Sequence, residues 1–577
     1  MKTITGIPAS YGIAIGPAFV YQRADLVIDC ENIEDPVLEW ARFESAQDTA
    51  RNQLDEVYLK AEIESGAEQA EIFKAQVMML DDPELVSTVK AVVYEQKLNV
   101  ESALSDAVEN YASMLEALDD EYLSARALDI RDVGSRLLRI LLGVADSPTK
   151  DLKTPSIIIA DDLTPSDTIL LDKTYVLGFC TSKGGATSHT AILARSLGIP
   201  AVVGAGSKVQ RLTTGTPVIV DGDSGAVIVE PDSSTLSEFQ FRQEEFLKVK
   251  GRASKVAHEP AVTLDGHRVE IVANIGSVED AQSALDAGAE GVGLLRSEFL
   301  YLERSTLPTE EEQYQSYKAI ADSFNQLPVI LRTLDVGGDK EIPYIDLPVE
   351  DNPFLGVRAI RLCLDRPQLF KPQLRAALRA GYGNNLKLMF PMVATVDEVK
   401  QAKALLDECC QELKDQGNLI QEKMEIGIMI EIPAAAIMAD QLAEVVDFFS
   451  IGTNDLSQYT MAADRTNARV AQIASGFQPA VFRLIKQVID AAHTRGKWVG
   501  LCGEMAGELI AIPILLGLGL DEFSMNPPAI PYAKLLIRSI SLEKARAVAE
   551  EALHKSNSDE IRELVRQRIP EVNLDVS

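Results

Sequence analysis

Hydrophobic and polar positions show two different spacings along this chain of 577 residues. Residues 37–142 carry apolar side chains at three- and four-residue spacing, as in ELVSTVKAVVYEQ and VGSRLLRILLG, and include only two glycines and one proline. That spacing predicts a bundle of amphipathic helices. Short apolar runs typical of strands return at 155–230, where TPVIVDGDSGAVIVEP predicts a hairpin around a DGDSG turn.

The first 30 residues are also strand-like and punctuated by glycines, as in YGIAIGPAFVYQ. The helical region therefore interrupts a small α/β domain that the N-terminal strands complete. A polar, helix-prone stretch follows the second group of strands. We expect an α/β domain formed by residues 1–30 and 146–232, an inserted helical domain at 31–145, and a helical linker at 233–259.

From residue 260 onward, short apolar runs alternate with helical stretches. The eight runs are VEIVANI, GVGLLR, VILRTL, LKLMFP, IGIMIE, FFSIGT, WVGLC and EFSMN. Eight such units within residues 260–577 predict a (β/α)8 barrel, which typically needs about 250 residues plus insertions. The main alternative is a doubly wound open sheet. The fold class is thus multidomain α/β, with a small α/β domain, an inserted helical bundle and a barrel.

Polar residues close several of the apolar runs. They are Arg296, Arg332, Glu431, Asn454, Asp455 and Cys502, and Arg465 follows soon after the sixth run. In a barrel the active site lies at the carboxyl ends of the strands. Charged groups at the ends of apolar strands cost free energy if they are buried alone, so we expect them to converge on a polar ligand. Any single one of them could instead form an ion pair at the barrel rim.

These residue types have a shared chemistry. Glu431 and Asp455 are hard carboxylates that suit Mg²⁺, and Mn²⁺ accepts the same ligands. The three arginines can fork onto phosphate and carboxylate oxygens, and Asn454 adds an amide. Cys502 would be largely protonated and could deliver a proton, although a buried thiol is also a common small apolar residue. The set describes a site for a small dianion or trianion whose leaving group becomes an enolate.

His189 is one of only five histidines, in the segment TYVLGFCTSKGGATSHTAILARSLGIPAVVG. The segment predicts a strand, a glycine turn, a helix capped by Ser188 or Thr187, a stop at Gly198 and Pro200, and a second strand. His189 then lies in the first helical turn, where free N–H groups favour an anion and disfavour an imidazolium. Covalent phosphorylation of a neutral imidazole fits this position best. A histidine that only caps the helix is the alternative.

Composition narrows the class of protein. The net charge of −32 argues against nucleic-acid binding and against a membrane-surface protein. Residues 36–143 hold 10 Lys and Arg against 22 Asp and Glu, which suits a docking face for a basic partner or a plain solvated bundle. No segment approaches the roughly 20 apolar residues of a spanning helix. Six cysteines without CxxC spacing fit a reducing compartment, so we expect a cytoplasmic protein without membrane insertion.

Two segments resemble a known family. GGATSHTAILAR is similar to the phosphohistidine signature of the phosphoenolpyruvate-utilising enzymes, and DFFSIGTNDLSQYTMAADR is similar to the metal- and substrate-binding signature of that family. The length, the inserted acidic helical region and the domain order resemble the branch that starts the bacterial phosphoenolpyruvate:sugar phosphotransferase system. The likeness covers essentially the whole chain.

The resemblance implies that His189 takes a phosphoryl group from phosphoenolpyruvate and passes it to a histidine of the small carrier HPr. It implies that Cys502 protonates the enolate to give pyruvate, and that Glu431 and Asp455 hold Mg²⁺. The implied substrate-binding residues are Arg296, Arg332, Asn454, Asp455 and Arg465, with Lys340 and Arg358 at the same mouth. Thr168 and Arg126 would lie near the phosphohistidine. Family members form homodimers through their barrels and bind HPr on the helical insertion.

One position departs from the family pattern: many members have arginine where this chain has Ala186, which puts one phosphate contact in doubt. The nucleophile and the substrate site fall in different domains, so we expect a large swivel about the linker. A phosphoenolpyruvate synthase or dikinase would need an ATP-binding domain, for which the first 145 residues leave no room. A barrel lyase or aldolase would not need His189, and a regulatory protein with a degenerate site would lack catalytic positions that are present here.

Overall fold

The computed structural model divides into two compact units, Met1–Leu247 and Lys248–Leu574. It describes residues 1–21, 26–65, 67–116, 121–144, 152–164, 167, 171–185, 188–301, 304, 306–338, 342, 344, 345, 347, 350–465, 467 and 469–572. Within these ranges, the side chains of residues 61–72, 116, 121–126, 128, 173, 189, 192, 196 and 197 are not described.

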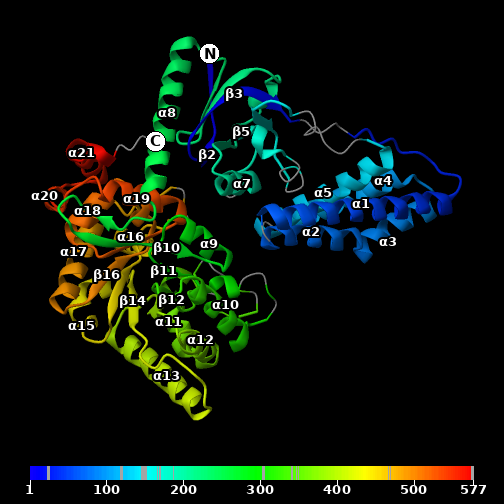
Figure 1. Cartoon of the computed structure of the whole chain (residues 1–577). Helices are drawn as coiled ribbons and strands as arrows, with labels where there is room; N and C mark the ends of the chain where they lie inside the picture. The colour runs from blue at the N-terminus through cyan, green and yellow to red at the C-terminus, as the bar shows by residue number, and fades with distance from the viewer. Residues whose placement is uncertain are drawn as a thin grey trace. The chain divides into compact units, whose positions relative to one another are not determined.

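The first unit contains an eight-stranded sheet with the order β1-β8-β7-β3-β4-β5-β6-β2 (Figure 1). Its strands are β1 (Lys2–Thr5), β2 (Ile7–Ser10), β3 (Ile13–Val20), β4 (Ser156–Ala160), β5 (Val176–Thr181), β6 (Ala201–Val203), β7 (Pro217–Asp221) and β8 (Ala226–Val229). The three strands that precede the helical region pair with strands that follow it, β3 with β4 and β7, β1 with β8, and β2 with β6. The predicted hairpin is confirmed, since β7 and β8 pair antiparallel from Val218 to Asp221.

A helical region separates β3 from β4 in the sequence. It consists of α1 (Pro36–Ser65), α2 (Ala67–Leu80), α3 (Pro83–Ala91), a π-helical turn (Val92–Gln96), α4 (Val100–Glu116) and α5 (Glu121–Leu142). The apolar positions recognised in the sequence form one core, in which Phe43, Leu54, Leu104 and Leu137 are fully buried. The three- and four-residue spacing therefore predicted the helices correctly, because it places these side chains on one face of each helix.

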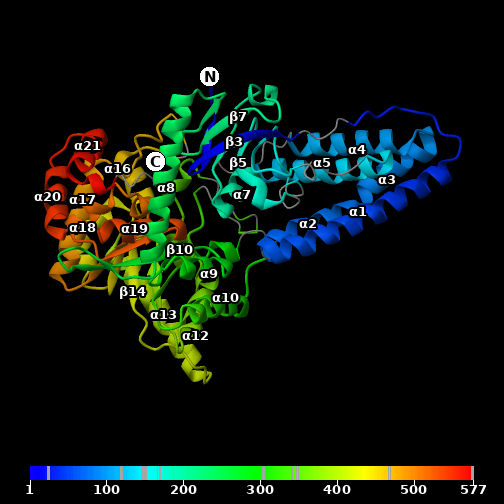
Figure 2. The same cartoon turned by 45° about the horizontal axis from the view of Figure 1, so that its top comes forward.

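A single helix, α8 (Ser233–Val256), leads from the first unit into the second (Figure 2). The second unit contains the parallel strands β10 (Arg268–Ile275), β11 (Val292–Leu295), β12 (Val329–Arg332), β13 (Leu386–Phe390), β14 (Ile426–Ile430), β15 (Phe448–Ile451), β16 (Trp498–Leu501) and β17 (Glu522–Met525). A short strand, β9 (Ala261–Val262), adds antiparallel to β10.

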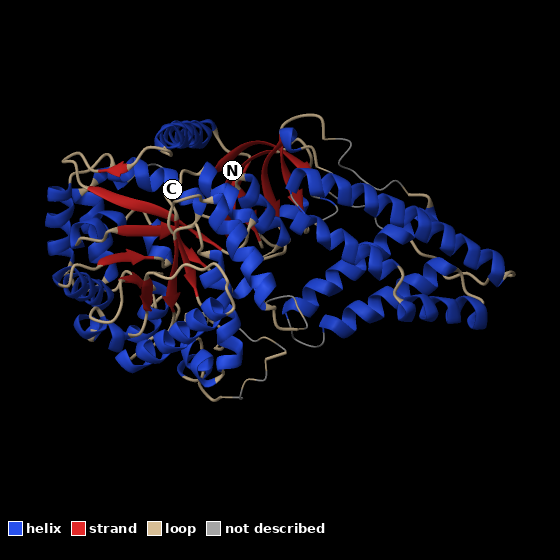
Figure 3. Ribbon diagram, turned by 60° about the horizontal axis from the view of Figure 1, so that its bottom comes forward, coloured by secondary structure: helices blue, strands red, loops and turns tan. Residues whose placement is uncertain are grey.

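Helices surround these strands (Figure 3). The longer ones are α9 (Glu279–Asp286), α10 (Glu310–Ser323), α12 (Pro367–Ala380), α13 (Val396–Asp415), α16 (Thr453–Met461), α17 (Pro479–Thr494), α19 (Ile530–Ile537), α20 (Leu542–Ala552) and α21 (Ser558–Arg568). The shorter ones are α11 (Ile360–Asp365), α14 (Pro433–Ile437), α15 (Ala439–Leu442) and α18 (Ile512–Leu518).

The eight parallel strands are the eight apolar runs of the sequence. β10 pairs with both β11 and β17, so the sheet closes on itself and forms a barrel. The predicted fold class is confirmed, and the open-sheet alternative is wrong. Inside the barrel an apolar layer of Leu294, Ile330, Met389, Met429, Phe448 and Cys502 fills the lumen.

No helix among the residues that the structure describes is both long enough and apolar enough to cross a bilayer.

Candidate active site

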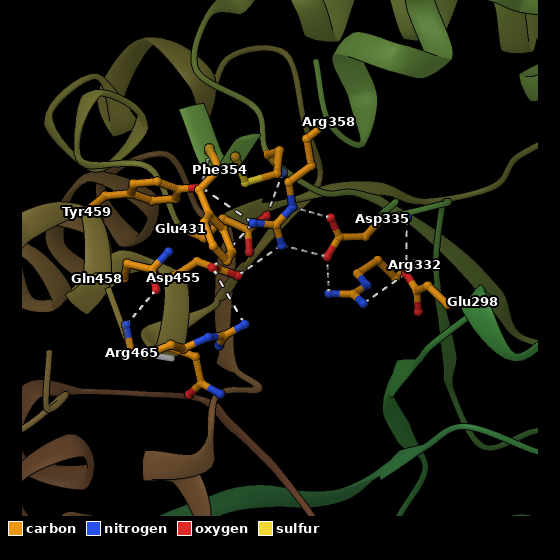
Figure 4. Close-up of polar contacts among 12 residues, drawn as sticks. Glu298, Arg332, Asp335, Phe354, Arg358, Glu431, Asp455, Gln458, Tyr459 and Arg465 are labelled. Atoms are coloured by element: carbon orange, nitrogen blue, oxygen red, sulfur yellow. Dashed lines mark hydrogen bonds and ion pairs between the residues drawn. The ribbon is translucent and has the colours of Figure 1, made fainter. Parts of the chain in front are cut away.

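A chain of alternating charges lies at the carboxyl ends of the barrel strands (Figure 4). Its members, in order of contact, are Glu298, Arg332, Asp335, Arg358, Asp455 and Arg465. Their closest N–O distances along the chain are 2.9, 3.1, 2.9, 3.3 and 3.9 Å. All but Arg465 are buried. Arg332, Asp455 and Arg465 are the members of this chain that were expected at the strand ends.

Arg358 is the central member of this chain. Its guanidinium donates to both oxygens of Asp335, at 2.9 and 3.1 Å, and lies within 3.5 Å of both oxygens of Asp455. Burial opposes its charge, but the two aspartates more than offset that effect, and its pKa is raised above the usual value. Arg358 is therefore a permanent cation held between two carboxylates.

Sequence reasoning missed Glu298 and Asp335. Both are buried and both contact Arg332, and the backbone N–H of Asp335 also donates to Glu298 at 3.0 Å. A usable signal was present, because RSEFL and RTLDVGG place an acidic residue two or three positions beyond an arginine at a strand end. Both residues follow a strand and do not close it, so the strand ends alone do not reveal them.

Glu431 is buried next to this chain, directly after β14. Burial raises the pKa of its carboxyl group, and the nearby Asp455 and Asp335 raise it further, against the opposing effect of Arg358 and Arg332. One carboxylate oxygen accepts a hydrogen bond from the backbone N–H of Met392 at 2.5 Å. The negative charges at this point are therefore not fully compensated by the neighbouring arginines.

Two non-glycine residues beside the site have left-handed backbone angles. Met392, which donates to Glu431, has φ = 56°, and Ala359, which follows Arg358, has φ = 52°. Such conformations cost roughly 1–3 kcal/mol each and persist where the surrounding structure holds them. Here the conformation of Met392 directs its N–H at Glu431, and that of Ala359 sets the path of the backbone next to Arg358.

Several buried polar atoms around the chain have no protein partner among the described residues. They are Arg332 Nε, Glu298 Oε2 and the hydroxyl oxygens of Ser297, Thr333 and Thr453. Buried donors without acceptors are costly, and they gather where a ligand supplies the missing partners. An unpaired Nε–H on a buried arginine and a group of free hydroxyls suit a small oxyanion.

The remaining predicted mouth residues lie in different surroundings. Asn454 exchanges two contacts with Glu504, donating to its Oε1 at 3.3 Å and accepting from its backbone N–H at 3.1 Å. The Arg465 side chain is half-buried, and its backbone N–H donates to Gln458 at 3.1 Å. Arg296 is exposed at the end of β11. Arg296 and Arg465 are thus accessible to a ligand. Arg332 is buried and is held by its ion pairs with Glu298 and Asp335.

Cys502 lies at the top of the apolar layer inside the barrel. Burial raises the pKa of its thiol to about 11, which keeps it protonated at neutral pH. The Asn274 amide donates to the Cys502 carbonyl at 3.0 Å and so holds the end of β16 against β10. The charges of Arg332 and Arg296 act against burial and lower the pKa of the thiol, whereas the charge of Glu431 raises it.

Glu431 and Asp455 fit the metal ion that the sequence suggested. They are two buried hard carboxylates, the ligand type that Mg²⁺ prefers. Among the described residues no group of three or more His, Cys, Asp or Glu side chains forms a complete metal site. A two-carboxylate set is consistent with Mg²⁺ that takes its other ligands from water and from a phosphorylated substrate.

The phosphohistidine candidate lies in the first unit. His189 is the first residue of α7 (His189–Leu197), as predicted, and the helix ends at Gly198 with φ = 61°. The preceding Ser188 has extended backbone angles, and its buried hydroxyl has no partner among the described residues. The helix therefore begins with unused donors at the residue expected to carry a phosphoryl group.

Several predicted site residues cannot be placed. Thr168 and Lys340 lie outside the described residues, as do Ala186 and Thr187, and the side chain of Arg126 is likewise outside the described part. Their assignments stay predictions.

Three domain descriptions of one enzyme family match this protein along its length. The description "PEP-utilising enzyme, N-terminal" matches residues 5–126, "PEP-utilising enzyme, mobile domain" matches residues 152–225, and "PEP-utilising enzyme, PEP-binding domain" matches residues 250–542. The mobile domain contains His189, and the PEP-binding domain contains the charge chain.

Curated relatives align over nearly the whole chain. The chain is 50% identical over 566 residues to a phosphoenolpyruvate-protein phosphotransferase of Bacillus sp. (strain S), covering 98% of each sequence. It is 48% identical over 567 residues to the protein of the same name from Staphylococcus carnosus (strain TM300), covering 98% of this chain and 99% of the relative. It is 47% identical over 567 residues to the one from Bacillus subtilis (strain 168), covering 98% of this chain and all of the relative.

Proposed function

Because the chain belongs to the phosphoenolpyruvate-utilising enzymes, and within them to the phosphoenolpyruvate-protein phosphotransferases, we propose that it phosphorylates its own His189 and then a histidine of the carrier protein HPr. Pyruvate is the second product. The reaction is the first step of the bacterial sugar phosphotransferase system. The observation that carries this proposal is the buried chain of alternating charges at the barrel mouth. Among the described residues, the Nε–H of Arg332 and the hydroxyls of Ser297 and Thr333 have no protein partner there.

In this proposal the mouth binds phosphoenolpyruvate by its two charged ends. Arg296 and Arg465 are accessible and approach the substrate, while Arg332 offers its unpaired Nε–H from the wall. Asn454 contributes its amide. The fixed donors bind the charge of the phosphoryl group in transfer without rearranging, which is the usual source of catalysis in phosphoryl transfer.

The chemical steps use two side chains. A nitrogen of the neutral His189 ring attacks phosphorus, a P–N bond forms, and the bond from phosphorus to the enol oxygen breaks. The enolate of pyruvate remains at the mouth. The Cys502 thiol then gives its proton to the methylene carbon, which produces pyruvate and a thiolate that solvent reprotonates.

Glu431 and Asp455 would hold Mg²⁺ or Mn²⁺. The ion would supply positive charge to the phosphate oxygens and to the developing enolate.

The proposal requires the two units to move relative to one another, since His189 belongs to one and the arginine chain to the other. We propose a swivel that carries the α/β domain alternately to phosphoenolpyruvate and to HPr, with HPr bound on the acidic helical region. A crosslink between the α/β domain and the barrel should block transfer to HPr, and unimpaired transfer would contradict the swivel.

We further propose a homodimer paired through the barrels and a cytoplasmic location. All six cysteines are free, which suits a reducing compartment. Analytical ultracentrifugation of the full chain and of its residues 248–577 would test the dimer. A monomer at micromolar concentration in both cases would contradict it.

The decisive experiment is labelling with phosphoenolpyruvate that carries radioactive phosphate, in the presence of Mg²⁺. We expect an acid-labile, base-stable label on the wild-type chain and none on the His189→Ala variant. Added HPr should then discharge the label. Consumption of phosphoenolpyruvate without a labelled protein would overturn the phosphotransferase function and favour a barrel lyase.

A further inference from the structure

Helix α8 is fastened to the sheet of the first unit over its amino-terminal half. Phe239 packs with Ile13, Ile219 and Ile228. Gln243 donates to the Ile13 carbonyl at 2.7 Å, and Arg242 pairs with the buried Asp221 at 3.3 Å. We therefore expect the helix to move together with the α/β domain. The attachment of the carboxyl end of α8 to the barrel would then limit the directions in which the domain can move.

The carboxyl end of α8 meets one buried lysine of the barrel, Lys534 on α19. Its ammonium group donates to the carbonyl of Ala257, which directly follows α8, at 2.9 Å, and to the carbonyl of Gly288 at 2.6 Å. Among the described residues no carboxylate forms an ion pair with Lys534, although the residue is almost completely buried. A lysine buried on two backbone carbonyls is unusual, because desolvating the charge is expensive.

Gly288 also forms part of this contact. It has φ = 84°, and a Cβ atom placed there would lie 1.9 Å from the Ala257 carbonyl oxygen and 3.2 Å from the backbone nitrogen of His258. The loop between α9 and β11 thus approaches the chain after α8 more closely than any other residue type allows. Gly288 and Lys534 enclose the same carbonyl from two directions.

The contact lies away from the candidate active site along the strands. Gly288 precedes β11, whereas the arginine chain follows the carboxyl ends of the strands. Figures 1 and 2 both show α19 beside the carboxyl end of α8. A defect at this contact therefore has no direct route to the residues that bind phosphoenolpyruvate.

We propose that Lys534 is a positioning residue that fixes how α8 leaves the barrel, and that it thereby sets the rate at which the phosphohistidine domain reaches phosphoenolpyruvate. The lysine holds the carbonyl of the residue that directly follows α8, at the end of the helix where a cation is favoured by the helix dipole. Gly288 allows the close approach that makes the hold rigid. This inference rests on the proposed function, because it concerns the delivery of His189.

The test uses the full chain with Lys534→Met, which keeps the length of the side chain and removes both hydrogen bonds. We expect the single-turnover rate of His189 phosphorylation to fall about 10- to 100-fold, the loss typical of misplaced reactants. The affinity for phosphoenolpyruvate, measured in a His189→Ala background, should stay unchanged. Discharge of the phosphorylated protein by HPr should also stay unchanged.

Leu536→Ala is the matched control. Leu536 is fully buried on the same helix but does not contact the carboxyl end of α8 through a hydrogen bond, so its truncation weakens the barrel without releasing the helix. If the two variants have equal melting temperatures, only Lys534→Met should slow the phosphorylation of His189. Hydrogen exchange at the amides of residues 252–258 should accelerate in Lys534→Met and not in the control.

Gly288→Ala tests the same contact from the other side and serves if Lys534→Met does not fold. It should reproduce both the slower phosphorylation and the faster exchange. Phosphorylation within twofold of the wild type in both variants, or an equal loss in Leu536→Ala, would overturn the positioning role alone. A wild-type chain that takes no label at His189 would overturn the proposed function and this inference together.

Discussion

Asp335 binds Arg358 through both carboxylate oxygens, Oδ1 to Nε at 2.9 Å and Oδ2 to Nη2 at 3.1 Å. Both side chains are about 1% exposed, and Asp335 also pairs with Arg332 at 3.1 Å. One buried aspartate therefore holds two of the cations at the barrel mouth in fixed directions. This relationship makes the site rigid before any ligand arrives, which is the condition for electrostatic catalysis.

Asp335→Asn should destabilise the barrel by roughly 3–5 kcal/mol, because it leaves two buried arginines short of one negative charge. It should also raise the KM for phosphoenolpyruvate, since Arg332 keeps Glu298 but loses one of the two carboxylates that orient it. Denaturant unfolding and steady-state kinetics measure the two effects. The exposed Asp322, paired with Lys318 at 2.8 Å, provides the control, and Asp322→Asn should change stability by less than about 1 kcal/mol. Equal effects of the two substitutions would contradict the central role of Asp335.

Cys502→Ala should leave phosphorylation of His189 nearly intact and slow pyruvate formation about 100-fold, the usual contribution of a general acid. The raised pKa of the thiol, about 11, means that the wild-type acid stays protonated across the physiological range. Quenched-flow measurement of labelled protein and of pyruvate separates the two steps. Cys409→Ala removes another buried thiol, on α13, and should affect neither step. Equal pyruvate formation by Cys502→Ala and the wild type would refute the role in protonation.

Removal of divalent cations with a chelator should abolish labelling of His189, and either Mg²⁺ or Mn²⁺ should restore it. Glu431→Gln should weaken Mn²⁺ binding more than about tenfold, because it removes one of two protein ligands. Electron paramagnetic resonance of Mn²⁺ reports binding without depending on activity. Glu504→Gln, at a carboxylate that contacts Asn454, is the control. Unchanged Mn²⁺ affinity in Glu431→Gln would exclude Glu431 as a ligand.

Glu522, at the start of β17, should make stability depend on pH. Burial, together with the charge of Glu270, raises the pKa of its carboxyl group from 4.5 to about 8, and its Oε1 has no partner among the described residues. Below pH 4.5 the group is protonated in the folded and unfolded states alike. Between pH 4.5 and 8 only the unfolded state ionises, so stability falls by about 1.4 kcal/mol per pH unit relative to Glu522→Gln.

Chemical unfolding of the wild type and Glu522→Gln across this pH range tests the expectation. The exposed Glu422, which pairs with Lys414, supplies a control substitution to glutamine that should leave the pH dependence as in the wild type. Parallel stability curves for the wild type and Glu522→Gln would show that Glu522 ionises normally in the folded protein.

Local patterns in the sequence predicted much of the architecture. Each of the eight apolar runs is a barrel strand, and the spacing of apolar residues in 37–142 corresponds to the helices of the bundle. The glycine turn and the stop at Gly198 correctly placed His189 at the start of α7. These features depend on neighbouring residues only, since a strand or helix forms from its own periodicity and its own end signals.

Contacts between distant residues were harder to predict. Arg358 was only a weak candidate in the sequence, and the structure makes it the centre of the charge chain, 23 residues from Asp335 and 97 from Asp455. Asp335 and Glu298 follow the strands instead of closing them, and the path of each loop decides which way they point. Lys534 lies 277 residues from Ala257 and 246 from Gly288, and no local pattern links them.

By itself the sequence determined the strands, the helices, their order and the residue types available at the strand ends, because these follow from local periodicity and chemistry. Only the tertiary structure decided which charges meet, which donors remain unpaired and where α8 is held. Closing a barrel brings the ends of eight strands to one place, and burial there turns a list of charged residues into a network in which each must find a partner.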